Sequence, residues 1–136
     1  MPRILITLAC AGLISCHPAG AQTLEGIAGH VVDGDTFDFR AIRIRICGIE
    51  APDRGEDGHH QATMALSALI EGKRVHCIPV GAGSACDGRS KLFSHKRIVA
   101  QCFAEGADIA ARMVQSGHAC DWVKFSGGAY PGGCRK

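Results

Sequence analysis

The feature that most constrains the fold is a strict alternation of isoleucine and arginine. In Ile42-Arg43-Ile44-Arg45-Ile46, an extended chain would place the isoleucines on one face and both arginines on the other. This pattern is typical of a strand with one buried face. Gly48 and Pro52 follow it and are expected to end the strand.

Two short β-type runs precede this strand. They cover Ile27 to Val32 and Thr36 to Phe39, and Asp33-Gly34-Asp35 separates them. Asp-Gly between apolar runs is a strong hairpin signal. We therefore expect three consecutive strands in this part of the chain.

The apolar period changes from two to that of a helix between His59 and Glu71. Gly72 is placed to end this helix. Its apolar stripe consists of Ala62, Ala65, Leu66, Leu69 and Ile70.

Two more strands and a second helix are predicted downstream. The strands are Arg74 to Val80 and Arg97 to Phe103, separated by a loop from Gly81 to Ser94. Asp108 is a plausible N-cap for a helix through Ser116, which Gly117 would end. Beyond Trp122 the sequence becomes glycine-rich and is expected to run over the surface.

The predicted order of three strands, helix, two strands and helix indicates a mainly β domain with helices. Short strands of this kind favour a closed or nearly closed barrel, which protects strand edges. The 136 residues leave room for one domain. We assign residues 22–26 to a linker, 27–125 to the domain and 126–136 to a glycine-rich tail.

Residues 1–21 have the composition of a secretory signal peptide. A positive start at Arg3 precedes an apolar run too short to cross a bilayer, and Ala19-Gly20-Ala21 follows as a cleavage site before Gln22. A buried N-terminal helix is the less favoured alternative. Leu13-Ile14-Ser15-Cys16 also resembles a bacterial lipobox, in which Cys16 would carry a lipid anchor. Both targeting interpretations predict export, to the periplasm or outside the cell.

Overall charge says little about partners. The formal net charge is +2, and removal of the leader would take away one basic residue, Arg3, and no acidic residue. Many nucleic-acid-binding proteins carry a strong basic excess. A nucleic-acid site on this chain would therefore need a local concentration of arginine.

Six of the eight cysteines lie beyond the predicted leader. An even number in a short exported chain indicates disulfides, and the absence of a C-x-x-C pair makes zinc the weaker alternative. Cys77 and Cys102 lie in two strands that could be neighbours, so they form the first pair we expect. The remaining pairing stays open among Cys47, Cys86, Cys120 and Cys134.

Acidic residues gather at two places near Arg45. Asp33 and Asp35 lie at the hairpin, and Glu50 and Asp53 follow the third strand. Each acidic group alone is more often a turn or a solvated loop. Together with arginine they suit phosphoryl chemistry, because oxygen ligands bind a hard cation and guanidinium groups hold the charge of the transition state.

These residues form a pattern that resembles the staphylococcal nuclease-like (thermonuclease) family. The likeness rests on Val32-Asp33-Gly34-Asp35-Thr36-Phe37 and on the segment from Ile44 to Asp53, IRICGIEAPD. Further downstream it includes Arg97-Ile98-Val99-Ala100 and Val114 to Ala119, VQSGHA. It covers roughly residues 27–125 in the right order and spacing.

The resemblance implies an OB-type barrel of five strands with two to three helices and calcium-dependent cleavage of DNA or RNA. It implies Asp35 and Glu50 as side-chain ligands of Ca²⁺, with the main-chain carbonyl of Ala51. Arg45, Arg97 and Asp53 would be the catalytic residues. The two arginines would grip the phosphate, and Asp53 would orient or deprotonate the attacking water. Nucleic acid is the expected partner, and we expect a monomer.

The chain departs from the family pattern at three places. Glu50 and Asp53 exchange the usual lengths of ligand and base, and we expect the longer Glu50 to shift the cation toward Asp53. His95-Lys96 stand before Arg97 where the usual tyrosine of the family is missing, and either residue could supply a substitute contact, although a polar loop residue is the interpretation we favour. The tyrosines of the family's base-binding pocket are also replaced, near Val123 and Phe125.

Other side chains admit two interpretations. His59-His60 could bind a metal but more simply face solvent at the start of a helix. Trp122, with Phe125 and Tyr130, could stack on bases, although we favour Trp122 as a residue that closes the core. Arg43 could broaden the positive patch or remain solvated.

The sequence thus predicts an exported calcium-dependent nuclease. The alternative is an OB-type module, catalytically weak or inactive, that binds nucleic acid or another anionic polymer.

Overall fold

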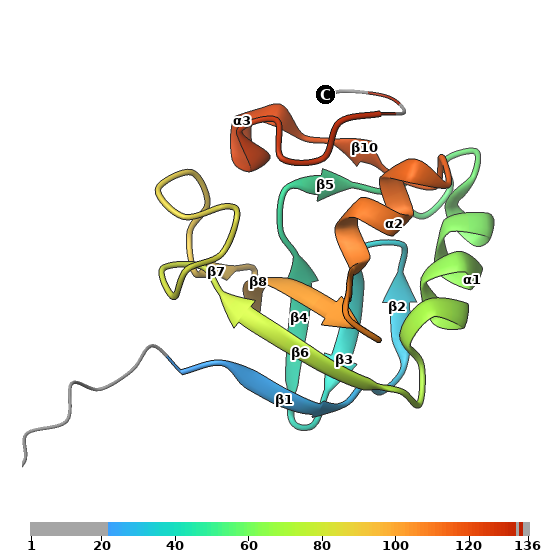
Figure 1. The fold of residues 1–136 in the computed structure, drawn as a ribbon. Coiled ribbons are helices and arrows are strands. Elements are labelled where there is room, and N and C mark those ends of the chain that lie inside the picture. Colours follow the sequence, from blue (N-terminus) through green and yellow to red (C-terminus); the bar gives the residue numbers. More distant parts are fainter. Residues whose placement is uncertain (1–21, 133, 135–136) are drawn as a thin grey trace, which may run out of the picture.

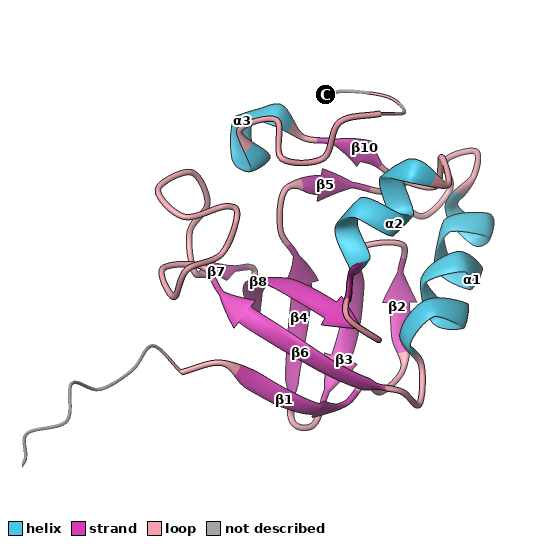
Figure 2. Cartoon of the chain, viewed as in Figure 1, coloured by secondary structure: helices cyan, strands magenta, loops and turns pink. Residues whose placement is uncertain are grey.

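The computed structural model describes residues 22–132 and Cys134, and most of the regular elements in this part of the chain are short strands (Figure 2). The predicted leader, with Cys16, lies outside the described residues, as do three residues of the predicted tail. The helices are α1 (His59–Ile70), α2 (Ile109–Gln115) and α3 (Val123–Ser126). The strands are β1 (Leu24–Ile27), β2 (Val31–Asp33), β3 (Thr36–Phe39), β4 (Ile42–Ile46), β5 (Ile49–Glu50), β6 (Arg74–Pro79), β7 (Phe93–Ser94), β8 (Arg97–Ala104), β9 (Ala107–Asp108) and β10 (Cys120–Asp121).

The main sheet follows the order β1-β6-β8-β4-β3-β2 and curls on itself (Figure 1). Only the β4–β8 pair is parallel among these neighbours, and β7 and β9 add short hairpins to β8. The end strands β1 and β2 follow each other in the sequence. The residues that connect them form hydrogen bonds to the segment just before β6 on one side and to β3 on the other. The N–H of Ala28 donates to the carbonyl of Lys73 (2.9 Å), and the N–H of Gly29 donates to that of Asp38 (2.8 Å).

No ladder joins β1 to β2 within the described residues, so the sheet is a curled half-barrel. The mainly β architecture with three short helices is confirmed and is consistent with an OB-like fold. The sequence predicted a closed or nearly closed barrel of five strands, and the structure corrects this: among the described residues the barrel is not closed, because a connecting segment and not a ladder joins the end strands.

The isoleucine–arginine alternation produces the expected half-buried strand. Ile44 and Ile46 of β4 are fully buried, and they pack in one core with the apolar side of α1. The helical stripe is confirmed, with Ala62, Leu66 and Ile70 buried and the other two members at the margin of the core.

The second helix is also confirmed, including its cap. The Asp108 carboxylate accepts the N–H groups of Ala110 (2.9 Å) and Ala111 (3.4 Å). The C-terminal stretch is more ordered than the sequence indicated, because it forms α3 and buries Ser126 and Tyr130. At the other end, β1 begins at Leu24, so three of its four residues lie in the segment assigned to a linker.

Three disulfides join the six described cysteines. Cys77–Cys102 links directly opposed residues of β6 and β8, as predicted. The other two pairs are Cys47–Cys86 and Cys120–Cys134. These bonds fit an oxidising compartment outside the cytoplasm. Within the described residues, no helix combines the length and apolar character needed to cross a membrane.

Candidate active site

The charged residues that the sequence singled out meet in one pocket. It is lined by Asp35, Arg45, Glu50, Asp53 and Arg97, together with Asp33. They come from the β2–β3 turn, the end of β4, β5 with the loop after it, and the start of β8. Of the predicted site residues only Ala51 does not line the pocket: it is buried, and its N–H donates to Asp35 Oδ2.

Strand register explains why Arg45 and Arg97 share this pocket. Arg45 is paired with Val99 across the parallel β4–β8 ladder, and paired residues point to the same face. Arg97 lies two residues before Val99 and therefore shares that face. The pairing of β4 with β8 thus brings together two arginines that are far apart in the sequence.

The motif glycines are required by close packing. A Cβ at Gly34 would lie 2.6 Å from that of Ala51 and 2.7 Å from that of Ala62, so the acidic turn fits tightly against α1. Gly48 has a φ of +77°, and a Cβ there would lie 2.9 Å from atoms of Ser126 and Tyr130. Gly34 therefore lets the acidic turn approach the second acidic segment at Ala51, and Gly48 lets the turn between β4 and β5 pack against the C-terminal segment.

Arg45 links the two predicted metal ligands. One guanidinium nitrogen lies 2.9 Å from Asp35 Oδ2, and the other lies 3.2 Å from Glu50 Oε2. The same side chain donates to the carbonyls of Ile46 (3.1 Å) and Ile49 (2.9 Å). These contacts fix the guanidinium in a single orientation, with its two carboxylates side by side.

Asp35 is almost wholly buried, with 6% of its surface exposed. Its carboxylate accepts the N–H of Ala51 (3.0 Å) and the hydroxyl of Thr36 (2.9 Å). Burial nevertheless raises the pKa of Asp35 to about 7, outweighing the opposing effects of the Arg45 guanidinium and the Ala51 N–H. A second positive charge beside this carboxylate would offset that cost of burial.

The donor set fits a hard divalent cation. Two carboxylates held by one guanidinium, with a main-chain carbonyl nearby in sequence, provide the oxygen ligands that such ions prefer. Among the described residues, no group of three or more His, Cys, Asp and Glu side chains gathers around one point. The two carboxylates of Asp35 and Glu50 are fewer than the six or more oxygen ligands that such a cation takes.

Arg97 is held less firmly than Arg45. Its guanidinium donates to the carbonyl of Ser94 (3.1 Å) and to the Ser94 hydroxyl (3.4 Å). Both partners belong to the β7–β8 hairpin, whose turn is His95-Lys96. His95 lines the pocket and Lys96 does not.

Asp53 lies in an exposed turn at the rim of the pocket. Its N–H donates to Glu56 Oε2 (2.7 Å), and its carboxylate has no hydrogen-bond partner in the described part of the chain. The turn leads into α1, where His59 Nδ1 lies 3.0 Å from the Pro52 carbonyl. His60 is exposed, in line with a solvent-facing start of the helix.

Several pocket residues were missed or misplaced from the sequence. Trp122 is half-buried and lines the pocket beside Phe125, with ring centroids 4.6 Å apart, so it does not close the core. Tyr130 occupies the core instead. Arg43 donates to Asp38 (2.7 Å) and lies outside the pocket lining. The newly found charged residues are Arg89, Lys91 and Lys124.

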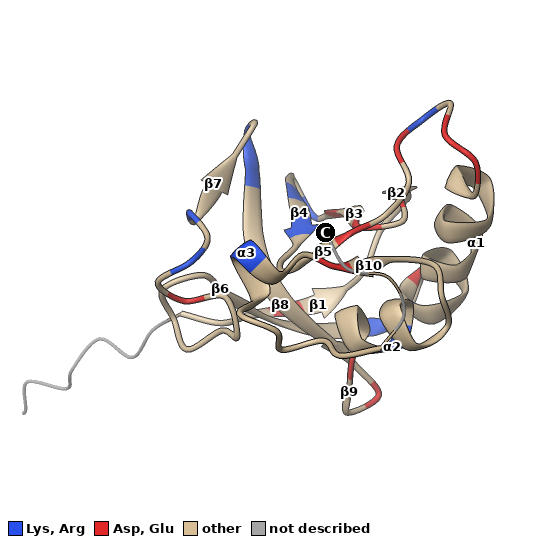
Figure 3. Ribbon diagram, turned by 90° about the horizontal axis from the view of Figure 1, so that it is seen from above, with Lys and Arg blue, Asp and Glu red and all other residues tan. Residues whose placement is uncertain are grey.

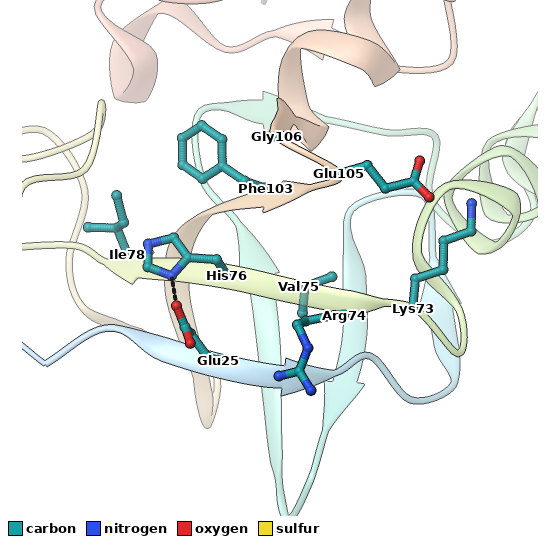
Figure 4. Close-up of a pocket in the computed structure, with 9 residues that line it drawn as sticks. All are labelled: Glu25, Lys73, Arg74, Val75, His76, Ile78, Phe103, Glu105 and Gly106. Carbon is teal, nitrogen blue, oxygen red and sulfur yellow. Dashed lines mark hydrogen bonds and ion pairs between the residues drawn. The ribbon is translucent and has the colours of Figure 1, made fainter.

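A second hollow lies on the β1–β6–β8 surface, away from these residues (Figure 4). His76 Nδ1 contacts Glu25 Oε1 there at 3.0 Å, and Phe103 stands beside them. Lys73 and Arg74 lie at its other end. None of the sequence motifs contributes to this hollow, so the first pocket is the candidate active site.

Comparison with known proteins relates the chain to named endonucleases. No family model matches it. The succinoglycan biosynthesis protein ExoI of Rhizobium meliloti (strain 1021) is 31% identical over 135 residues, covering 88% of this chain and 64% of that protein. An uncharacterized endonuclease of Escherichia coli is 28% identical over 111 residues, covering 78% and 65%. One from Escherichia coli O157:H7 is 32% identical over 62 residues, covering 43% and 40%. The chain thus spans less than two thirds of the length of these relatives.

Proposed function

We propose that this chain is an exported, metal-dependent nuclease that hydrolyses phosphodiester bonds of DNA or RNA. The observation that carries the proposal is Arg45 in contact with both Asp35 and Glu50, with Arg97 on the same face of the sheet. Two relatives named endonucleases support it. Paired acids beside paired guanidinium groups suit phosphoryl transfer and few other reactions.

In this mechanism the arginines bind the phosphate at the reacting centre. Guanidinium groups donate two parallel hydrogen bonds to phosphate oxygens and retain their charge at any physiological pH. Arg45 is held in advance by its carboxylates, so little ordering remains when substrate binds. In the described part of the chain, the Arg97 guanidinium hydrogen-bonds to Ser94 alone, and it can turn toward the phosphate.

Asp53 is the proposed base. It lies at the rim of the pocket with its carboxylate open to solvent, where it can accept a proton from an attacking water. Asp53 is one methylene shorter than the glutamate of the resembled family, a difference of about 1.5 Å in reach. We propose that the longer Glu50 compensates by moving the cation toward Asp53.

Calcium is the proposed cofactor. Asp35 and Glu50 would hold it with the carbonyl of Ala51. A bound divalent cation polarises the phosphoryl oxygen and neutralises charge that develops on it. The protein's own part is to keep two largely buried carboxylates on either side of one guanidinium.

A cleavage assay tests the proposal. The purified, oxidised protein is expected to digest single-stranded DNA with Ca²⁺ and to stop when a chelator is added. Asp35→Ala and Arg97→Ala are each expected to lose activity, whereas Arg74→Ala in the second hollow is expected to retain it. Binding without cleavage under every divalent ion would refute the nuclease.

That last outcome would favour a second function, a non-catalytic module that binds nucleic acid or another anionic polymer. One observation supports this alternative: the charge of Arg45 is already balanced by two carboxylates, which leaves less of it for substrate. In addition, one relative is named for succinoglycan biosynthesis and not for a nuclease. The cleavage assay, run alongside a binding measurement, separates the two functions.

A further inference from the structure

One wall of the pocket is a loop that the sequence motifs do not account for. Residues 81–92, called the tethered loop below, connect β6 to β7 and project beside the pocket (yellow in Figure 1). The loop carries Arg89 and Lys91 into the pocket lining. Both side chains are exposed, and neither forms an ion pair with any described carboxylate.

The tethered loop is fixed to the site at three points. Just before it, the Val80 N–H donates to the Val99 carbonyl (2.9 Å), and the Val99 N–H donates to the Leu92 carbonyl (2.8 Å). Val99 is the residue opposite Arg45 in the β4–β8 ladder. Midway, Cys86 is disulfide-bonded to Cys47, two residues after Arg45. A small buried cluster of Cys47, Val80, Cys86 and Val99 fills the space beneath.

Asp87 organises the interior of the loop. Its carboxylate accepts the N–H groups of Gly81 (2.7 Å), Gly83 (2.9 Å) and Ser84 (3.2 Å) and the Ser84 hydroxyl (2.6 Å). These hydrogen bonds, that of the Ser84 hydroxyl first, lower the pKa of Asp87. The loop backbone is therefore ordered before any ligand binds, which reduces the entropy lost on binding.

Arg89 also contacts the C-terminal end of α3. Its guanidinium lies against Gly127, where a Cβ would come within 2.5 Å of Nε. Lys124 of α3 joins Arg89 and Lys91 in the pocket lining. Viewed from above, the basic residues of the loop, the β7–β8 hairpin and α3 lie on one side of the site, and acidic residues around β5 and the following loop lie on the other (Figure 3).

We propose that the tethered loop binds phosphates that flank the scissile one, so that the protein acts on a polynucleotide chain in preference to an ester of a single nucleotide. This inference rests on the proposed function for the identity of the ligand. Arg45 and Arg97 serve the phosphate at the reacting centre. The unpaired charges of Arg89 and Lys91 extend the positive surface past the site, where a longer chain would continue.

The test measures binding without cleavage. The oxidised full chain is titrated against a fluorescein-labelled 12-nucleotide single-stranded DNA, in chelator, over 50 to 200 mM salt. Each phosphate contact contributes about 0.7 to the slope of log affinity against log salt for single strands. Arg89→Gln with Lys91→Gln is therefore expected to reduce the slope by about 1.4. Lys73→Gln with Arg74→Gln, which removes the same charge from the second hollow, is expected to leave it unchanged.

Cleavage kinetics supply a second readout. If the nuclease is active, the loop variant is expected to raise KM for the oligonucleotide while kcat and the hydrolysis of a p-nitrophenyl ester of a single nucleotide stay unchanged. An unchanged salt slope in the loop variant, an equal loss in the control, or no binding by the unmodified chain would overturn the inference. The inference would also be overturned if polygalacturonate, added at the same concentration of negative charge, displaced the DNA. That result would assign the surface to acidic polysaccharide.

These results separate the two proposals. Loop-dependent binding without cleavage rejects the nuclease and retains the phosphate surface. Cleavage with a salt slope that does not depend on the loop retains the nuclease and rejects the phosphate surface.

Discussion

The two sides of the candidate active site are held in opposite ways. On the acidic side, the side chains themselves are fixed: Arg45 contacts Asp35, Glu50 and two carbonyls, and all three charged groups are largely buried. On the tethered loop, the backbone is fixed and the charged ends of Arg89 and Lys91 are exposed.

The difference matches the precision that each side needs. Groups that act at a reacting centre must be held within about 0.5 Å, which requires hydrogen bonds to the side chains themselves. Contacts to flanking phosphates require charge at roughly the right place, so a fixed backbone with exposed side chains is sufficient.

Arg45→Met is expected to cost both stability and activity. It would leave Asp35 buried without its cation, and breaking such a pair costs about 3–5 kcal/mol of unfolding free energy. Loss of one charge-stabilising donor lowers kcat by about 10²- to 10³-fold. Urea unfolding and single-stranded DNA cleavage measure the two effects.

Arg97→Met is the matched control, because the Arg97 guanidinium hydrogen-bonds only to Ser94 among the described residues. Its activity is expected to fall to a similar degree, with a stability change within about 0.5 kcal/mol. Equal stability losses in both variants would show that the two arginines are held alike. The double variant Arg45→Met with Asp35→Asn is expected to recover stability and remain inactive.

The disulfides provide the second comparison. Cys47–Cys86 and Cys77–Cys102 close loops with sequence separations of 39 and 25, so loss of either is expected to cost about 4 kcal/mol in the chain-entropy account. Only the first holds the tethered loop to the site. Replacing Cys47 and Cys86 by alanine is therefore expected to raise KM for the oligonucleotide, whereas replacing Cys77 and Cys102 is expected to leave KM unchanged. Equal KM values in the two variants would mean that the loop keeps its position without the tether.

Asp53→Glu tests whether the length of the base is compensated. A displacement of about 1 Å can change a rate by on the order of 100-fold. If Glu50 adjusts the position of the cation as proposed, the longer side chain brings little benefit, and kcat is expected to stay within about tenfold. A gain of several orders of magnitude would reject compensation. Asp57→Glu, in the same exposed segment but outside the pocket lining, is the control.

Much of the fold could be predicted because it follows local patterns. The Asp33-Gly34-Asp35 hairpin, the alternation in β4, the stripe of α1 and the Asp108 cap each depend on neighbouring residues. The motif residues around Arg45 could be placed together because short strands and a tight turn leave little freedom between them.

The remaining wall of the pocket depends on contacts between distant residues. β10 pairs with β5, Cys86 bonds to Cys47, and Arg89 lies against Gly127, and none of these contacts has a local signature. Trp122 was misplaced for the same reason: the pairing of β10 directs the chain after it toward the pocket instead of the core. Because the sequence alone does not show that Cys47 pairs with Cys86, no feature of the sequence assigns the tethered loop to the site.

The conformation of the turn before Arg97 could not be predicted from the sequence either. A substitution in this turn gives the smallest expected effect. His95 and Lys96 have φ angles of 48° and 63°, so both central residues of this hairpin turn are left-handed. Such turns favour Asn-Gly. The β8–β9 hairpin has the same geometry at Glu105 and Gly106, with a glycine at the second position. Lys96 therefore occupies, beside the site, a position that glycine fills elsewhere in the same sheet.

Lys96→Gly is expected to raise the unfolding free energy by about 1 kcal/mol, because a left-handed lysine costs about 1–2 kcal/mol and glycine's extra chain entropy offsets part of the gain. Gly106→Lys, the reciprocal change, is expected to cost a similar amount, measured by urea unfolding of both variants. Since Lys96 does not line the pocket, oligonucleotide KM is expected to stay within about twofold in Lys96→Gly. A more stable but poorly binding variant would instead place Lys96 on the phosphate path, and the strained turn would then be the cost of presenting that charge beside Arg97.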